Sequence, residues 1–355
     1  MQIKRRKARI VKIGKIGIGG TLPIAIQSMV KSKTSDIQKS IGQIEQLDRA
    51  GCEIVRLAVK DLDDARAIKK IRQSVKLPLI ADIHFDWRLA LAAMENGAQK
   101  IRLNPGNIYK KEEVCQVASS ARQNRIPIRV GANSGSLKLS GSTGKRSFSL
   151  AGSMVEGVMD YIRMLEGFKF YDIVVSLKAS NILDTVQAYT KIARLCDYPL
   201  HLGVTATGPS FSGAIKSSIA LGMLLKDGIG DTLRVSLTDT PTEEVRAAKI
   251  ILEALNLRNF GPEIISCPTC GRCEVDLIGI VKGLEARISN INHKAPNRRL
   301  KLAVMGCVVN GPGEAAQADI GVAFGRKEGL LFKKGKPIRK VNLHNCIAAL
   351  LSQME

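Results

Sequence analysis

Four of the eight cysteines gather in two short segments of the last third of this 355-residue chain. Three lie in the run Cys267-Pro-Thr-Cys270-Gly-Arg-Cys273, and the fourth, Cys307, opens a glycine-rich stretch that ends at Glu314. Thiolates at such spacing bind zinc or an iron–sulfur cluster, and nearby glycines leave room for a cluster. A structural zinc site remains the alternative. A thioredoxin-like redox pair is disfavoured, because no suitable βα unit begins there.

The other four cysteines, Cys52, Cys115, Cys196 and Cys346, are isolated in helical or apolar surroundings, which is typical of small buried residues. The basic N-terminal residues are followed by no hydrophobic stretch, so we expect no secretory signal and no disulfide framework. The expected location is the cytoplasm.

A second group of chemically capable residues lies near the carboxyl ends of short aliphatic runs. Its members, which we predict to bind or act on substrate, are Arg56, Asp82, His84, Arg102, Arg129, Asn133, Lys178 and Ser236. Arginine forks fit phosphate oxygens, so several of them converging indicate a multiply charged phosphate ester. Strand alternation allows any single member to face outward instead, and Arg234 is the weakest further candidate.

The elements that must position these residues follow a regular rhythm. Eight aliphatic runs alternate with helix-like segments, such as Asp36–Ala50 with apolar residues three and four apart. The runs are Pro23–Met29, Ile54–Val59, Pro78–Ile83, Lys100–Leu103, Pro127–Ala132, Asp172–Leu177, Leu200–Val204 and Thr232–Leu237. This pattern predicts an N-terminal (β/α)₈ TIM barrel, whose strand ends form the active site. A doubly wound sheet is the runner-up, but its G-x-G-x-x-G fingerprint is absent.

The rhythm changes after Phe260-Gly261-Pro262. We expect a barrel over residues 1–258 that binds a phosphate ester, and a smaller α/β domain over 262–355 that holds the cysteine centre. The smaller domain is predicted to contain helices over Glu274–Ile288 and Asn342–Met354, and strands over 264–267, 301–304, 320–322 and 330–332.

The composition narrows the class of protein. Hydrophobic residues make up 45%, which excludes global disorder, and no apolar run approaches the ~20 residues of a membrane span. The formal net charge is +22, which favours polyanionic partners of some kind. Only 4% of the residues are aromatic, which counts against stacking on single-stranded nucleic acid. We expect neither membrane insertion nor nucleic-acid binding.

These motifs together give a family resemblance. The chain resembles the short bacterial form of the 4-hydroxy-3-methylbut-2-en-1-yl diphosphate synthase family, which acts in the methylerythritol phosphate isoprenoid pathway. The resemblance covers nearly the whole chain. The matching stretches are Ala25–Met29, Ala50–Arg56, Ala81–His84, Ile101–Asn107, Ile128–Asn133, His201–Thr205, Gly228–Ser236, Cys267–Cys270 and Gly306–Glu314.

The resemblance implies a [4Fe–4S] cluster held by Cys267, Cys270, Cys307 and Glu314, with Cys273 outside the ligand set although spacing alone would include it. It implies an oxidoreductase that opens the ring of 2-C-methyl-D-erythritol 2,4-cyclodiphosphate with two electrons from flavodoxin or ferredoxin. Arg56, Arg102, Arg129 and Lys178 would then grip the diphosphate, while Asn133, Asp82 and His84 orient substrate or protons. It also implies a homodimer in which the cluster domain of one subunit completes the barrel of its partner.

One position departs from the family pattern. The family usually has Thr-Glu-Ala-Gly after the seventh strand, and that Glu is implicated in catalysis, whereas this chain has Thr205-Ala206-Thr207-Gly208. Asp82, Glu314 or water would have to take over the proton transfer. Ala206 leaves open a related iron–sulfur reductase of altered specificity. The net positive charge and the alternative of a zinc site leave a second rival, a basic nucleic-acid-binding protein with a structural zinc domain.

Overall fold

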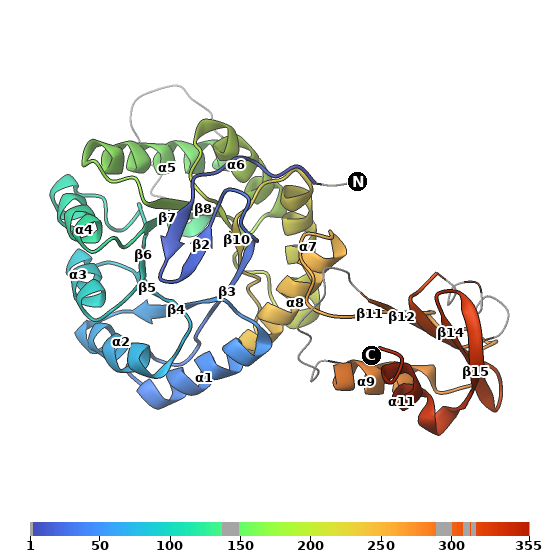
Figure 1. The fold of residues 1–355 in the computed structure, drawn as a ribbon. Coiled ribbons are helices and arrows are strands. Elements are labelled where there is room, and N and C mark those ends of the chain that lie inside the picture. Colours follow the sequence, from blue (N-terminus) through green and yellow to red (C-terminus); the bar gives the residue numbers. More distant parts are fainter. Residues whose placement is uncertain (1–2, 137–148, 289–299, 308–312, 314–316, 355) are drawn as a thin grey trace. The chain divides into compact units, whose positions relative to one another are not determined.

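The computed structural model describes residues 3–136, 149–288, 300–307, 313 and 317–354. The chain folds as two compact units, Met1–Arg258 and Asn259–Glu355 (Figure 1). Each unit has its own main sheet, of eight strands in the first and five in the second.

The first unit is a barrel of eight parallel strands, each hydrogen-bonded to the next along the chain. A bridge between Val175 and Leu200 joins the sixth and seventh strands of the barrel and completes the circle. The barrel strands are β3(Ala25–Met29), β4(Ile54–Val59), β5(Leu79–Ile83), β6(Lys100–Leu103), β7(Ile128–Asn133), β8(Ile173–Lys178), β9(His201–Leu202) and β10(Thr232–Leu233). The predicted (β/α)₈ fold is therefore confirmed.

A helix follows each barrel strand and covers the outside of the barrel (Figure 1). The helices are α1(Ile37–Ala50), α2(Leu62–Ser74), α3(Trp87–Glu95), α4(Lys111–Gln123), α5(Leu150–Gly167), α6(Ile182–Leu195), α7(Ser210–Lys226) and α8(Pro241–Ala254). Helix α1 shows the local logic. The Asp36 side chain caps its first turn by accepting from Lys39 N, and Gly51 ends it with a φ of 88° that favours glycine. Ile44 and Leu47 are buried on its inner side.

A hairpin precedes the first barrel strand and was not predicted from the sequence. Strands β1(Val11–Ile13) and β2(Ile16–Ile18) pair antiparallel, and Val11, Ile13 and Ile18 are buried. They pack against residues near the amino ends of the barrel strands, among them Ile54, Ile80 and Val174. The hairpin therefore closes this end with apolar side chains and leaves the carboxyl ends of the strands for chemistry.

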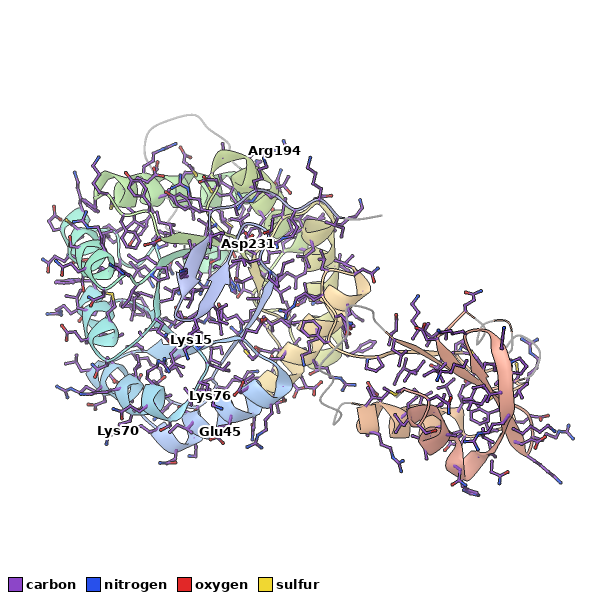
Figure 2. The ribbon with its side chains drawn as sticks, in the orientation of Figure 1. Lys15, Glu45, Lys70, Lys76, Arg194 and Asp231 are labelled. Carbon is purple, nitrogen blue, oxygen red and sulfur yellow. The ribbon has the colours of Figure 1, made fainter. Side chains whose placement is uncertain are left out.

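Asp231 anchors the N-terminal segment to the barrel (Figure 2). Its carboxylate accepts from Arg5 Nη2 at 2.8 Å and from Leu200 N at 2.8 Å, and Arg6 Nη2 lies 3.8 Å away. The carboxylate is 2% exposed, so breaking this arrangement leaves a buried charge unpaired. Part of the basic N-terminal segment is thus structural.

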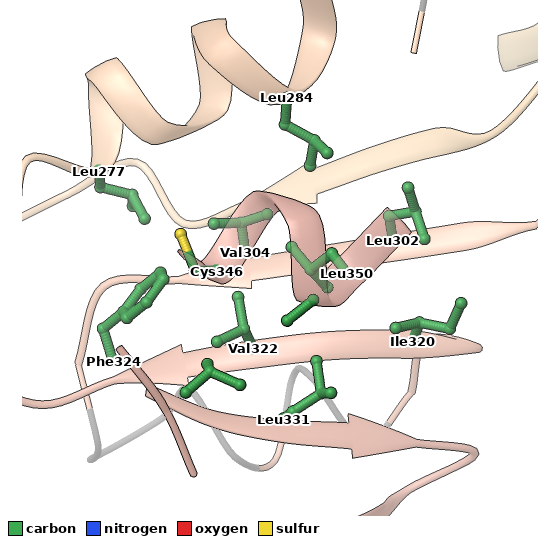
Figure 3. Close-up of a cluster of buried hydrophobic side chains, with 12 residues drawn as sticks. Leu277, Leu284, Leu302, Val304, Ile320, Val322, Phe324, Leu331, Cys346 and Leu350 are labelled. Carbon is green, nitrogen blue, oxygen red and sulfur yellow. The ribbon is translucent and has the colours of Figure 1, made fainter. Parts of the chain in front are cut away.

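The second unit is a five-stranded sheet in the order β11-β12-β13-β14-β15. The strands are β11(Glu263–Ser266), β12(Lys301–Met305), β13(Ile320–Phe324), β14(Glu328–Lys333) and β15(Lys336–Asn342), and the first three run parallel. Helices α9(Leu277–Ile288) and α11(Cys346–Leu351) pack on one face of the sheet. Their Leu284 and Leu350 join Leu302, Val322 and Leu331 in a buried core (Figure 3).

Strand β15 was missed in the sequence because its pattern is almost entirely polar. Five consecutive residues from Lys336 are exposed, and only Val341 is buried. The strand forms because its backbone pairs with β14, and this pairing cannot be recognised from the side chains of β15 alone. The basic stretch from Arg326 to Lys340 therefore lies on a β-hairpin of defined structure.

Candidate functional site

The carboxyl half of the barrel interior holds charged residues where barrels usually hold branched apolar ones. Asp82 on β5 is central. Its Oδ2 lies 3.4 Å from Arg56 Nε, and its Oδ1 accepts from Arg102 Nη1 at 3.1 Å. Arg102 also donates from Nη2 to the Gly131 carbonyl at 2.9 Å. One carboxylate thus fixes two arginines from the neighbouring strands β4 and β6.

The electrostatics of this group favour an ionised Asp82. Burial by itself raises the pKa of the carboxyl, but the charges of Arg56, Arg102 and Arg129 outweigh it, and the pKa lies well below its usual range. Burial lowers the pKa of Arg56 to about 10, which leaves it charged at neutral pH. Asp82 is therefore a fixed anion that orients arginines.

Several buried donors on the barrel strands have no hydrogen-bond partner among the described residues. They are Gln27 Nε2, Lys100 Nζ, Arg102 Nε, and Nε and Nη1 of Arg129, and the Gln27 Oε1 acceptor is also unpaired. Arg129 is 1% exposed and Lys100 is fully buried. Buried polar groups are normally hydrogen-bonded, so this concentration of open donors fits an oxyanion or ordered water. In the sequence, Lys100 is recognisable only as the start of an aliphatic strand.

A second chain of polar side chains runs along the neighbouring strands β8, β9 and β10. Lys178 Nζ lies 3.2 Å from His201 Nε2, and His201 Nδ1 lies 2.8 Å from Thr232 Oγ1. Burial, together with the nearby Lys178 charge, keeps the pKa of His201 well below its usual range. Burial and the surrounding arginines, Arg129 first, lower the pKa of Lys178 in the same way. A bound anion would reverse this and favour the charged ammonium.

The charge of Arg234 is neutralised within the protein by the carboxylate of Glu244. Its Nε and Nη2 donate to the two Glu244 carboxylate oxygens at 3.0 and 3.1 Å, and Glu244 is 1% exposed. Ser28 Oγ also donates to Glu244, at 3.0 Å. Glu244 lies on α8, several residues after β10 in the sequence. The pattern of residues at strand ends therefore does not identify it. Arg234 therefore offers less free charge to a ligand than Arg129 does.

The remaining predicted residues lie on loops or strand ends of the same side. His84 follows β5, its carbonyl accepts from Asn107 Nδ2 at 2.8 Å, and its buried Nδ1 has no partner among the described residues. Asn133 ends β7 in register with Lys178. The Ser236 carbonyl accepts a hydrogen bond from the Thr207 hydroxyl. Among the described residues, no hydrogen bond or ion pair joins the Ser236 side chain to the arginine group.

Two glycines give the long cationic side chains their space. A Cβ on Gly131 would lie 2.8 Å from Arg102 Nε, and one on Gly203 would lie 2.5 Å from Lys178 Nζ. Distances this short would force the buried cations to move. Glycine at positions 131 and 203 therefore allows the Arg102 and Lys178 side chains to occupy their positions beside these strands.

The cysteine loop of the second unit forms a separate candidate site. Gly306 N donates to Cys267 Sγ at 3.3 Å, and a Cβ on Gly306 would lie 2.5 Å from Cys273 Sγ. Cys270 is exposed, and Cys307 is of intermediate exposure. Among the described residues, no three His, Cys, Asp or Glu side chains are arranged to hold a metal ion. The predicted ligand Glu314 lies outside the described residues.

These thiols nevertheless fit a soft metal centre. A backbone N–H aimed at a cysteine sulfur and a glycine without a Cβ beside two thiols are features that cluster-binding loops use. The donor set is sulfur rather than oxygen or imidazole, which favours iron–sulfur or zinc over hard cations.

Comparison with known family models identifies the family of this chain. The family model described as the GcpE TIM-barrel domain matches residues 8–249, and the model described as the GcpE protein C-terminal domain matches residues 263–355. The chain belongs to the GcpE family. The family predicted from the sequence motifs is therefore confirmed, and so is its two-part organisation of a TIM barrel followed by a smaller domain.

Curated relatives of this GcpE protein cover nearly its full length. A protein of Fusobacterium nucleatum is 51% identical over 97% of this chain and 96% of its own length. A protein of Lawsonia intracellularis is 53% identical over 95% of this chain and 92% of its own. Both are named 4-hydroxy-3-methylbut-2-en-1-yl diphosphate synthase (flavodoxin).

Solved structures support the barrel fold alone. Dihydropteroate synthase from Stenotrophomonas maltophilia superposes with a TM-score of 0.54 at 12% identity, and covers 70% of this chain and 98% of its own. The Yersinia pestis enzyme of the same name gives a TM-score of 0.50 at 12% identity, with 70% and 98% coverage. In the described part of the GcpE chain, no helix has the length and apolar character needed to cross a membrane.

Proposed function

We propose that this protein is an iron–sulfur oxidoreductase that converts 2-C-methyl-D-erythritol 2,4-cyclodiphosphate into 4-hydroxy-3-methylbut-2-enyl diphosphate. The observation that carries this is the 51% identity, over 97% of the chain, to a relative named for this synthase activity. The relatives confirm the activity predicted from the sequence, and none of those compared supports altered specificity or a nucleic-acid-binding zinc protein.

The barrel interior is the proposed diphosphate site. Arg56, Arg102, Arg129 and Lys178 would bind the phosphate oxygens, with Asn133 and Ser236 as further contacts. The open donors of Arg129 and the unpaired Arg102 Nε support this, because a diphosphate would satisfy them. Asp82 would hold Arg56 and Arg102 in place, at 3.4 and 3.1 Å. We propose that Lys100, the first residue of β6, donates an additional hydrogen bond to the diphosphate from the side of the amino ends of the strands.

The reaction takes up two electrons and one proton, opens the cyclic diphosphate and releases water. The cations would stabilise the charge that develops on the diphosphate as it leaves the carbon. His84, whose buried Nδ1 is unpaired, would hold or deliver a proton, and Glu314 is the second proposed acid–base group. Asp82 is unsuited to donate a proton, because its low pKa keeps it ionised at neutral pH.

The second unit would carry the cofactor. Cys267, Cys270, Cys307 and Glu314 are the proposed ligands of a [4Fe–4S] cluster, and the N–H of Gly306 would stabilise the Cys267 thiolate. When bound, such a cluster supplies single electrons at low potential. Flavodoxin is the proposed donor, since the relatives carry it in their names, with ferredoxin as a possible substitute.

We also propose a homodimer in the cytoplasm, with no nucleic-acid partner. The family resemblance supports the dimer, because the cluster unit of one subunit would complete the barrel of its partner. Analytical ultracentrifugation of the anaerobically purified protein would measure the oligomeric state.

The decisive experiment combines cofactor analysis with turnover. Anaerobically purified protein should be brown, absorb near 400 nm and contain about four irons per chain. With a strong reductant it should convert the cyclodiphosphate into the linear diphosphate, and Arg129→Met should reduce kcat/KM by at least about tenfold through loss of a charged donor. A colourless protein with one zinc, or a cluster-replete protein that leaves the cyclodiphosphate unchanged, would overturn the proposal.

A further inference from the structure

Two of the loop cysteines converge on one glycine. A Cβ on Gly306 would lie 2.5 Å from Cys273 Sγ and 3.5 Å from Cys267 Sγ, so both sulfurs lie within a few ångström of one point. The backbone N–H of Gly306 donates to Cys267 Sγ, and Cys273 Sγ donates to the Val275 carbonyl at 3.4 Å. Both thiols are partly buried against the core of the second unit. These contacts hold the two sulfurs on the same side of the loop.

Cys270 behaves differently, although it lies between them in sequence. Its side chain is exposed, and Thr269 before it has a φ of 64°, which turns the chain at this point. The Cys270 carbonyl accepts from Cys273 N at 2.9 Å, so the turn brings Cys273 back towards the core. The cysteine nearest to Cys267 in sequence is therefore not the one that packs beside it.

We infer that, in the cluster-free protein, Cys267 and Cys273 form a reversible disulfide and leave Cys270 as a free thiol. This inference rests on the proposed function only in that Cys267 is otherwise a cluster ligand. It gives a role to Cys273, which lies outside the ligand set that the resemblance implies. The glycine at position 306 leaves the space that both sulfurs occupy, and a larger residue would separate them.

The chemistry needs a two-electron oxidant, for which oxidised glutathione suffices. One thiolate attacks the glutathione disulfide and releases one glutathione, and the second thiol attacks the mixed disulfide and releases the other. Two protein thiols are oxidised, one glutathione disulfide is reduced to two glutathione molecules, and the two thiol protons pass to the departing glutathione thiolates. The bridge would protect Cys267 from irreversible oxidation when the cluster is lost. It would also withhold one ligand, so cluster assembly would require prior reduction.

The test uses the full-length, cluster-free chain. The protein is treated with oxidised glutathione, its remaining thiols are alkylated with iodoacetamide, and it is digested with trypsin. Cleavage after Arg258, Arg272 and Lys282 separates peptide 259–272, which holds Cys267 and Cys270, from peptide 273–282, which holds Cys273. We expect these two peptides joined by a disulfide, with the alkyl group on Cys270. A bridge inside peptide 259–272, a bridge to Cys307 or no bridge would overturn the inference.

Two matched variants make the result independent of a single substitution. Cys270→Ser should leave the cross-linked peptide pair unchanged, whereas Cys273→Ser should abolish it. If Cys273→Ser fails to fold, the wild-type and Cys270→Ser digests still decide the pairing.

A second arm separates this inference from the proposed function. The oxidised wild-type chain is given iron and sulfide with and without dithiothreitol, and bound iron is counted. We expect the oxidised wild-type chain to load its cluster much more slowly without dithiothreitol than with it, and Cys273→Ser to show a smaller difference between the two conditions. Failure of the fully reduced protein to load any cluster would contradict the proposed function, while the peptide result would still decide the disulfide.

Discussion

At the residue scale, one carboxylate controls the proposed substrate site. Asp82 offsets Arg56 and Arg102, and all three side chains are almost buried. Asp82→Asn would leave two buried guanidinium charges without their anion, so we expect a loss of about 3–5 kcal/mol in unfolding free energy at pH 7. Urea denaturation of the wild type and of Asp82→Asn measures this difference in unfolding free energy.

The difference in unfolding free energy between the wild type and Asp82→Asn should depend on pH, because the pKa of Asp82 is lowered in the folded state. The stabilisation is present above the ordinary Asp pKa of about 4 and is lost as the pH falls through the lower folded-state value. The gap between wild type and Asp82→Asn should therefore narrow below about pH 4. Added sulfate should also narrow it at pH 7, by binding the freed arginines. A gap that is constant from pH 3 to 7 would contradict the assigned role of Asp82.

Lys100 represents the opposite case, a buried amine with no hydrogen-bond partner in the described part of the chain. Burial and the charge of Arg129 depress its pKa, so folding at neutral pH favours loss of its proton. Lys100→Met should therefore stabilise the ligand-free protein by about 1–3 kcal/mol at pH 7, the cost of one unsatisfied buried donor. The gain should shrink as the pH approaches the ordinary Lys value of about 10, where the unfolded chain also loses the proton. Denaturation at pH 7 and pH 9.5 checks both statements.

Ala206 marks the position where the family carboxylate is missing. It lies exposed in the loop after β9 with a φ of 54°. If the family Glu transfers a proton, Ala206→Glu should raise kcat of the reconstituted enzyme, by up to the 10²–10⁴-fold typical of a positioned acid or base. Ala206→Gln, which cannot transfer a proton, is the matched control. Equal activity of all three proteins would show that this chain uses another group.

At the scale of elements, the barrel strands are shaped by what their neighbours carry. Gly131→Ala would place a methyl group 2.8 Å from Arg102 Nε and 3.0 Å from Ser176 Oγ. We expect a loss of about 1–3 kcal/mol from overpacking and a higher KM, because Arg102 must move. Gly222→Ala is the control: it lies in α7 with no atom within 4 Å of the new Cβ, and should stabilise the helix by about 0.5–1 kcal/mol. Similar effects of both variants on KM would contradict this account.

The same elements show what the sequence reveals and what it conceals. Branched apolar runs and capped helices such as α1 are local patterns, so all eight barrel strands could be predicted. The β1–β2 hairpin and β15 depend on pairing partners rather than on their own residues, and they were missed. In the site, strand ends pointed to Arg129 and Lys178. The partner Glu244 and the buried Lys100 emerge only when the barrel closes.

At the scale of the whole molecule, the charge of +22 far exceeds what the barrel interior uses. The β14–β15 hairpin carries exposed cations at Lys333, Lys334 and Lys336. Helix α2 of the barrel carries others at Lys69 and Lys70, and Lys70 points away from the barrel (Figure 2). Only the first set belongs to the unit that is proposed to receive electrons.

An acidic electron donor such as a flavodoxin would be steered by the first set. Its rate of reducing the enzyme should fall steeply between 50 and 500 mM salt, because surface attraction is screened over about 10 Å at 0.1 M. Replacing Lys333, Lys334 and Lys336 by Glu should slow reduction by about tenfold or more at low salt and flatten the salt dependence. Replacing Lys69 and Lys70 by Glu should change much less. Stopped-flow absorbance of the cluster measures these rates, with reduced methyl viologen as a donor that needs no protein docking. If both sets of variants slow flavodoxin equally, the excess charge acts through the net field rather than through the second unit.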